Sequence, residues 1–123
     1  MANYQEPDNP KDLDPKGLDN VFQALADPTR RAVLARLTHG PATVSELAEP
    51  FEMALPSFLQ HLKVLEESGL VASKKEGRVR TCEAQFKTLT EAEEWIAHQR
   101  AVWEGRLDRL DAYLKTLQAT EKE

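Results

Sequence analysis

Short hydrogen-bonding side chains line one face of the segment Leu55–Leu70, and their chemistry suits contact with the edges of DNA bases. Phe58, Leu62 and Leu65 recur at steps of four and three residues, which predicts an α-helix that buries this apolar face. The remaining surface carries neutral polar groups and one cation: Pro56, Ser57, Gln60, His61 on the flank, and Lys63. Such a helix can enter the major groove, where base edges offer donors and acceptors. The alternative interpretation is an ordinary solvated helix face.

Four cations gather around an expected turn at Gly77, shortly after this helix. From Val71 onward the alternation changes to a period of 2, and two such runs, 71–76 and 79–84, flank Gly77 as in a β-hairpin. The cations are Lys74, Lys75, Arg78 and Arg80. After a DNA-reading helix, a basic hairpin would lie over the sugar-phosphate backbone as a wing. Taken alone, it is also typical of a sheet edge that resists strand addition.

A short capped helix is expected directly before the segment 55–70. Thr43 and Glu46 have the spacing of a capping box, which predicts a third helix over 44–51. A link of a few residues then leads into the fourth helix. Two short helices joined in this way, the second polar on its outer face, form a helix-turn-helix.

Two further helices are expected upstream, over about 18–26 and about 28–38. Between them, Asp27 is a good N-cap, and Pro28 suits the first helical turn, where its missing N–H is not needed. The residues expected to face the core from the second helix are Ala32, Val33, Leu34 and Leu37.

A long amphipathic helix is expected over about 90–117, begun by a capping box of Thr90 and Glu93. Its apolar residues form a heptad-like seam: Ile96, Trp103, Leu107, Leu110, Leu114 and Leu117. One small domain cannot bury a helix this long, so the seam predicts a homodimer. The first helix would complete the interface with Leu18, Val21, Phe22 and Leu25. The alternative is a helix folded back over its own domain.

Composition bounds the remaining possibilities. A chain of 123 residues supports one domain with a modest core, and the net charge of −5 argues against a wholly basic surface. Residues 28–80 nevertheless hold eight basic and six acidic side chains, and the balance reverses after them. The N-terminal stretch lacks the apolar region of a secretory signal, and no apolar run approaches the roughly 20 residues that cross a bilayer. The single cysteine, Cys82, fits a reducing cytoplasm.

Residues of about 18–85 closely resemble the ArsR/SmtB family of winged-helix transcriptional repressors. The matching pieces are LADPTRRAVLARL (25–37), VSELAEPFEMALPSFLQHLKVLEESGLV (44–71) and KKEGRVRTCEA (74–84). The resemblance implies a homodimer that binds a roughly palindromic operator and represses transcription. It also implies that the helix over 57–67 enters the major groove while the wing touches the flanking backbone.

The metal ligands of many family members are missing here. The third helix lacks their Cys-x-Cys pair, and the last helix has only His98, near Glu91 and Glu94. One histidine with flexible carboxylates makes a weak zinc site, so we expect neither a metal nor another cofactor. Cys82 is expected to pack as a small hydrophobic side chain rather than to sense redox changes, because the chain has no resolving cysteine.

Two further departures concern the reading helix itself. Leu59 stands where many relatives have a serine, and it either packs against the second helix, which is the expected outcome, or meets a thymine methyl group. Ala54 replaces the common serine or threonine at the helix entry, so its N-cap should be weak.

The sequence therefore predicts a mainly α fold with a small β-hairpin (α+β), a winged helix-turn-helix that is dimeric through its first and last helices. Its expected parts are an N-terminal tail over 1–17, disordered or arm-like, a winged helix-turn-helix domain over 18–87, a dimerisation helix over 88–118 and a tail over 119–123.

The predicted function is sequence-specific DNA binding by a homodimeric repressor, which reads an inverted repeat through the helix 56–67 and the basic wing 74–80. The alternative is a winged-helix protein-interaction module that does not bind DNA. An enzyme is not expected, because no nucleophile with a base, phosphate-binding loop or metal cluster is recognisable. No motif identifies an effector, whether a small molecule or a protein. A groove between the first and last helices, near Phe22, Trp95 and Trp103, could take a small apolar molecule, but aromatic residues at a dimer seam more often serve packing alone.

Overall fold

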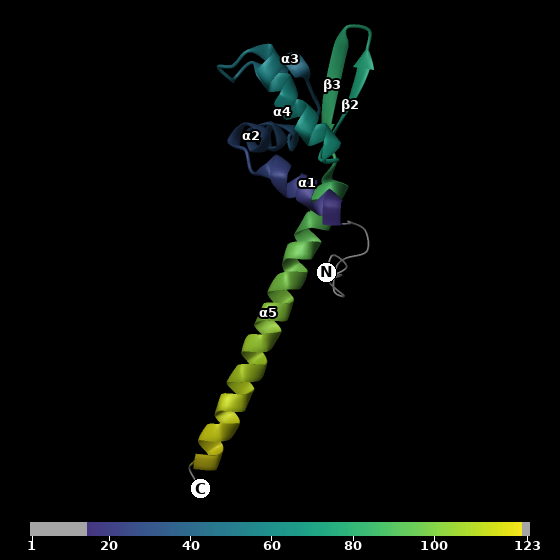
Figure 1. Cartoon of the computed structure of the whole chain (residues 1–123). Helices are drawn as coiled ribbons and strands as arrows, with labels where there is room; N and C mark the ends of the chain where they lie inside the picture. The colour runs from purple at the N-terminus through teal and green to yellow at the C-terminus, as the bar shows by residue number, and fades with distance from the viewer. Residues whose placement is uncertain (1–14, 122–123) are drawn as a thin grey trace, which may run out of the picture. The chain divides into compact units, whose positions relative to one another are not determined.

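The computed structural model describes residues 15–121, which form five helices and three short strands (Figure 1). In chain order these are α1 (Pro15–Leu25), α2 (Pro28–Leu37), β1 (Ala42–Thr43), α3 (Val44–Ala48), α4 (Leu55–Glu67), β2 (Val71–Glu76), β3 (Val79–Ala84) and α5 (Phe86–Glu121). This confirms the mainly helical fold with a small antiparallel wing. The chain divides into two units, one that includes α1 through Ala92 and one that includes α5 from Glu93 onward.

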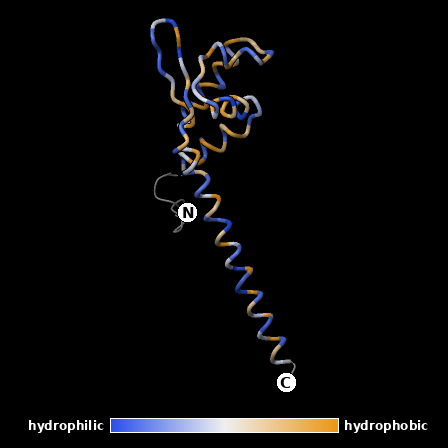
Figure 2. The backbone as a smooth tube through the Cα atoms, turned by 180° about the vertical axis from the view of Figure 1, so that it is seen from behind, coloured by the Kyte–Doolittle hydropathy of each residue, from blue (hydrophilic) through white to orange (hydrophobic). Residues whose placement is uncertain are grey.

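The predicted apolar face of α4 forms the centre of the core in the first unit. Phe58 and Leu62 are 1% exposed, and Leu65 is fully buried. Figure 2 shows hydrophobic segments from several elements gathered in this unit. The other elements contribute buried apolar residues around α4: Val21, Val33, Leu37, Ala42, Leu47, Val71 and Cys82. The outer face of α4 is thereby left as its free surface.

Local capping chemistry starts two of the helices as predicted. The Asp27 carboxylate accepts a hydrogen bond from the backbone N–H of Arg30 at 3.1 Å, at the start of α2. At α3 the backbone N–H of Glu46 donates to Thr43 Oγ1 at 3.2 Å, and the Thr43 N–H donates to Glu46 Oε1 at 3.0 Å. The capping box is therefore confirmed, as is the absence of a side-chain cap at Ala54.

The hairpin has the expected register, but a third strand joins it. Val71 lies opposite Ala84 and Glu76 opposite Val79, and Gly77 turns the chain with a φ of 65°. The short strand β1 pairs with β3 on the other side and gives the order β1-β3-β2. A strand of two residues is too short to show an alternating pattern, which is why the sequence did not indicate it.

Predicted boundaries are wrong in three helices. Helix α1 already begins at Pro15, so residues 15–17 belong to it, and the rest of the expected tail lies outside the described residues. Helix α3 ends at Ala48 rather than at residue 51. Helix α5 begins at Phe86, so Thr90 is inside the helix and is not its N-cap. It also runs to Glu121, so residues 119–121 of the expected C-terminal tail belong to it.

A backbone contact lies immediately before the start of α5. The Gln85 backbone N–H donates to the Leu70 carbonyl oxygen at 2.8 Å, which fixes the chain where β3 ends. The helix follows at once. Two smaller expectations also change: Ala32 is exposed rather than buried, and Phe51 lies outside α3, where its ring stacks on Phe58 at a centroid distance of 5.7 Å.

Candidate nucleic-acid interface

The outer face of α4 presents the side chains that the sequence assigned to base recognition. Pro56, Ser57, Gln60 and Lys63 are all exposed. The helix has no side-chain cap, but Pro56 in its first turn needs no N–H partner. The exposed groups include hydroxyl, amide and ammonium donors, and this combination can contact both base edges and phosphates.

His61 is held on its flank by α2 rather than left free on the outer face. Its Nδ1 lies 3.0 Å from Nη1 of Arg30 and 3.6 Å from Oδ2 of Asp27. Arg30 also donates from Nε to the Ala24 carbonyl oxygen at 2.8 Å and from Nη2 to the Gln23 carbonyl oxygen at 3.0 Å. This guanidinium therefore ties α1, α2 and α4 together, and only His61 Nε2 remains for another partner.

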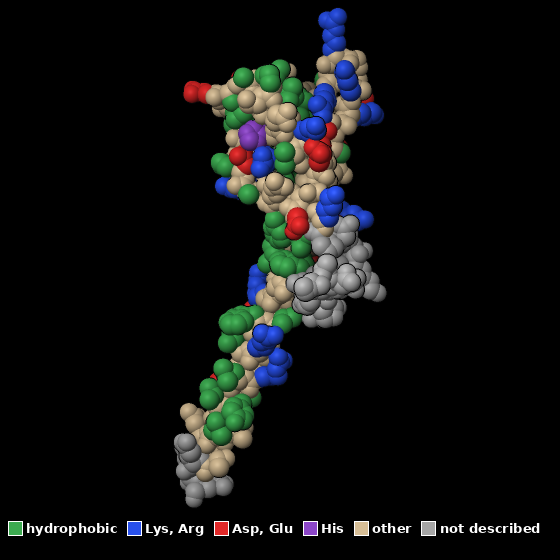
Figure 3. All heavy atoms as spheres, in the orientation of Figure 1, with side chains coloured by type: hydrophobic (Ala, Val, Ile, Leu, Met, Phe, Trp, Pro, Cys, Tyr) green, Lys and Arg blue, Asp and Glu red, His purple; other side chains and the backbone are tan. Residues whose placement is uncertain are grey.

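Cationic side chains project from the hairpin beside α4. Lys74, Lys75 and Arg78 are exposed, and Figure 3 shows blue Lys and Arg side chains over this part of the molecule. Lys74 lies 3.4 Å from Glu76, with both side chains about three-quarters exposed or more. An ion pair so open to water is weak, so Lys74 can be redirected to a phosphate at little cost.

Arg80 differs from the other three cations because it is already bound within the protein. Its guanidinium forms an ion pair with Glu66 of α4, and its Nε donates to Ser73 Oγ of β2 at 3.0 Å. The Ser73 hydroxyl in turn donates to the other Glu66 carboxylate oxygen at 3.0 Å. This closed set, which we call the wing clamp, joins both strands of the hairpin to α4. Arg80 is therefore engaged within the protein, and its predicted phosphate contact stays a prediction.

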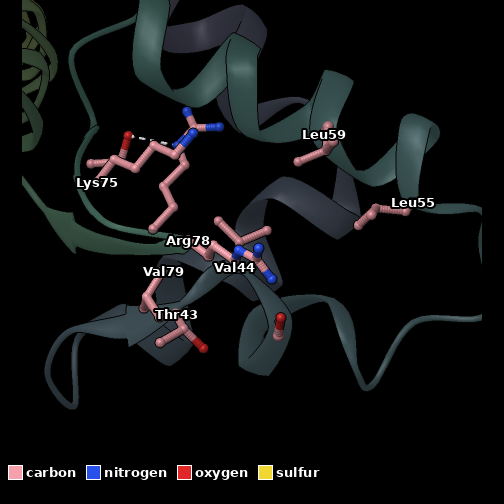
Figure 4. Close-up of a pocket in the computed structure, with 10 residues that line it drawn as sticks. Thr43, Val44, Leu55, Leu59, Lys75, Arg78 and Val79 are labelled. Carbon is pink, nitrogen blue, oxygen red and sulfur yellow. Dashed lines mark hydrogen bonds between the residues drawn. The ribbon is translucent and has the colours of Figure 1, made fainter.

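A groove of about 590 Å³ separates α4 from the hairpin (Figure 4). The dashed line in Figure 4 marks the hydrogen bond from Arg80 to Ser73. The lining combines apolar, hydroxyl and cationic groups: Thr43, Val44, Ser45, Leu55, Leu59, Ser73, Lys75, Arg78, Val79 and Arg80. Neither the wing clamp nor the groove has a signal in the sequence, because the residues that form them are far apart along the chain.

The residues assigned to a dimer interface fall into two groups. Leu18 is 9% exposed and Val21 is fully buried within the core of the first unit, so the prediction that they form an interface is wrong. Phe22 is 36% exposed, and Leu25 is partly exposed. The seam residues of α5 are 42–59% exposed: Ile96, Trp103, Leu107, Leu110, Leu114 and Leu117. They lie along one long helix and form an apolar stripe without a described cover.

Cys82 lies in the core, as predicted. It is fully buried on β3, where burial and the negative charge of Glu66 raise the pKa of its thiol, while Arg80 opposes them. A buried thiol with a raised pKa holds little reactive thiolate. Within residues 15–121 no three His, Cys, Asp or Glu side chains come together as a metal site. No helix in that range is both long and apolar enough to cross a bilayer.

Comparison with known proteins finds similarity to helix-turn-helix transcriptional regulators. Residues 25–74 match a helix-turn-helix domain family. The chain is 49% identical over 59 residues to the HTH-type transcriptional regulator Rv2034 of Mycobacterium tuberculosis, a match over 48% of this chain and 55% of that relative. It therefore spans only about half of that protein's length.

Two longer matches extend the likeness. The transcriptional repressor SdpR of Bacillus subtilis is 30% identical over 79 residues, which cover 64% of this chain and 88% of that protein. The crystal structure of an ArsR family transcriptional regulator is 58% identical, with a TM-score of 0.72 over 75% of this chain and 95% of that one.

Proposed function

We propose that this chain, which belongs to the ArsR family of winged helix-turn-helix transcriptional regulators, represses transcription by binding operator DNA as a homodimer. The observation that carries the proposal is the side-by-side placement of an exposed polar face on α4 and an exposed cationic hairpin. In this arrangement α4 reads base edges in the major groove, and the hairpin binds the adjacent backbone.

The distribution of charge indicates that α4 and the β2–β3 hairpin contribute differently to DNA binding. Lys74, Lys75 and Arg78 are open to solvent, so they can neutralise phosphates and release counterions. The core-facing side of α4 is fixed by Phe58, Leu62 and Leu65, so its outer face is presented in one orientation. The cations thus supply affinity, and the helix supplies sequence preference.

The exposed stripe on α5 supports the homodimer. The leucine side chains of the stripe remain 42–53% exposed. Removing apolar surface from water is favourable by about 25 cal/mol for each Å², so burial of the stripe against a second copy of the same helix would stabilise a dimer. A two-fold dimer would present two reading helices about 34 Å apart, one turn of DNA, and would therefore select an inverted repeat.

The test begins with selection of bound duplexes from a random-sequence pool by the full chain, followed by affinity measurements on the selected site. Gln60→Ala should relax the base preference at one position of each half-site, because it removes an amide that can pair with a base edge. Arg78→Ala should weaken binding to all sequences alike, because a phosphate contact carries no sequence information.

Lys115→Ala is the matched control for the loss of a cation. Lys115 lies on α5, outside the hairpin, and its ammonium group pairs with the Asp111 carboxylate at 3.1 Å. Its loss should leave affinity and preference unchanged. If the wild-type chain enriches no sequence and shifts no duplex even at low salt, DNA binding is refuted and the protein-interaction alternative takes its place.

A further inference from the structure

Leu59 is not a core residue. It is 36% exposed, whereas the residues of α4 that do pack inward, such as Phe58 and Leu62, are 1% exposed. The packing expected from the sequence is therefore incomplete, and about a third of the residue stays open to solvent. Leu55, one helical turn earlier, is 54% exposed, so both leucines present apolar surface on the groove side of the helix.

The groove beside these leucines has a mixed chemistry that suits one strand of a duplex. Val79, on the hairpin side, is 52% exposed and adds to the apolar lining, and Lys75 and Arg78 supply cations. In the major groove of DNA, the thymine C5-methyl is the apolar group among the hydrogen-bonding base edges, and phosphates flank it. The apolar side chains of the groove therefore match the thymine methyl groups of a DNA strand, and its cations match the phosphates of that strand.

We infer that Leu59, with Leu55 beside it, reads thymine methyl groups in the operator. The inference rests on the proposed function and adds a specificity determinant to it. Residues spaced by four lie on the same helix face, so Leu55, Leu59 and Lys63 form one stripe along α4. The leucines select methyl groups on the bases, and Lys63 reaches the backbone or a base acceptor beyond them. Gln60 acts through hydrogen bonds one step around the helix.

The experiment replaces single thymines in the selected operator by deoxyuridine, which removes only the methyl group and keeps every hydrogen bond. Affinity is measured with the full chain at fixed salt by fluorescence anisotropy. At one or two thymine positions in each half-site, the substitution should weaken wild-type binding about fourfold per methyl, the value for one buried apolar carbon. For Leu59→Ala this sensitivity should disappear, because its methyl side chain no longer reaches the base.

Three controls separate this interpretation from loss of structure or of DNA binding. Leu59→Ala should retain the helical circular dichroism of the wild type, because the residue replaced lies at the surface. Leu59→Met keeps an apolar side chain and should retain sensitivity to deoxyuridine. Gln60→Ala should change base preference elsewhere and also retain that sensitivity.

The possible results are distinct. The inference is overturned if no thymine of a well-bound operator responds to loss of its methyl group, or if Leu59→Ala responds as strongly as the wild type. A failure of the wild-type chain to bind any duplex would instead overturn the proposed function, and this inference with it.

Discussion

Asp27 serves two elements with one carboxylate. It caps α2 through the Arg30 N–H and lies 3.6 Å from Nδ1 of His61 on α4. Burial tends to raise the pKa of this carboxyl, but the Arg30 N–H and the nearby charges of His61 and Arg30 outweigh it and hold the pKa below its ordinary value of 3.8. The ionised form is therefore favoured in the folded protein. This residue links the helix cap to the seating of the reading helix.

Asp27→Ala should reduce the free energy of unfolding by about 1 kcal/mol near neutral pH, since it removes the N-cap. Asp27→Asn should be less destabilising, because its amide oxygen still accepts the N–H. A carboxyl with a depressed pKa stabilises the fold above its unfolded-state pKa, and this contribution disappears as pH falls through the folded-state value. Urea unfolding at several pH values should show that the difference in free energy of unfolding between wild type and Asp27→Asn disappears below about pH 4. A difference independent of pH would contradict this assignment.

At the scale of elements, the wing clamp decides where the hairpin stands relative to α4. Glu66, Ser73 and Arg80 come from α4, β2 and β3, and their hydrogen bonds close on one another. The pair of Arg80 and Glu66 is only partly exposed, at 38% and 25% of each side chain. A tethered hairpin loses less entropy when it binds a partner. We therefore expect the clamp to contribute to DNA affinity without contacting a phosphate.

Arg78→Ala and Arg80→Ala should therefore differ in the salt dependence of DNA binding. Arg78→Ala should lower the slope of log affinity against log salt by about 0.9 for each phosphate that the protein no longer neutralises. Arg80→Ala should weaken binding but leave that slope close to the wild-type value, because its charge is paired with Glu66. Affinity titrations over a series of salt concentrations measure both slopes. If Arg80→Ala lowers the slope as much as Arg78→Ala does, the clamp is not its role.

At the scale of the whole molecule, the exposed stripe on α5 is an apolar surface for which the described residues 15–121 provide no cover. It runs from Ile96 to Leu117 along a helix of 36 residues, Phe86–Glu121. Apolar side chains appear along α5 at intervals in Figure 3. An apolar stripe of this length is typical of a helix that packs against another helix. In the proposed dimer, Phe22 of α1 adds a further exposed aromatic side chain.

Leu110→Glu should convert the dimer into monomers and reduce operator affinity by at least tenfold, because it places charge in an apolar seam and removes the second reading helix. Sedimentation velocity measures the oligomeric state, and anisotropy measures DNA binding. Leu110 is 53% exposed in the protomer, so the substitution should leave the fold intact. Asp108→Ala, a surface change on the same helix, is the control. A Leu110→Glu variant that remains dimeric would exclude this seam.

The sequence was informative wherever local chemistry sets the structure. Asp27, Thr43 and Glu46 marked helix starts because capping depends on neighbours three residues away, and Gly77 marked the hairpin turn because it adopts a positive φ. The start of α5 was mistaken because the spacing of Thr90 and Glu93 resembles a capping box, whereas the helix begins at Phe86, directly after the hydrogen bond between Gln85 and Leu70.

The sequence by itself determined the order of the five helices and the hairpin, the buried face of α4 and the presence of four cations in the hairpin, since all three follow from the types and spacing of side chains. Only the tertiary structure decided which of those groups remain available. It engages Arg80 with Glu66, ties His61 to Arg30, buries Val21 and leaves Leu59 at the surface. The physical reason is that exposure and pairing depend on contacts between elements distant in the chain, and a helical or alternating period does not encode those contacts.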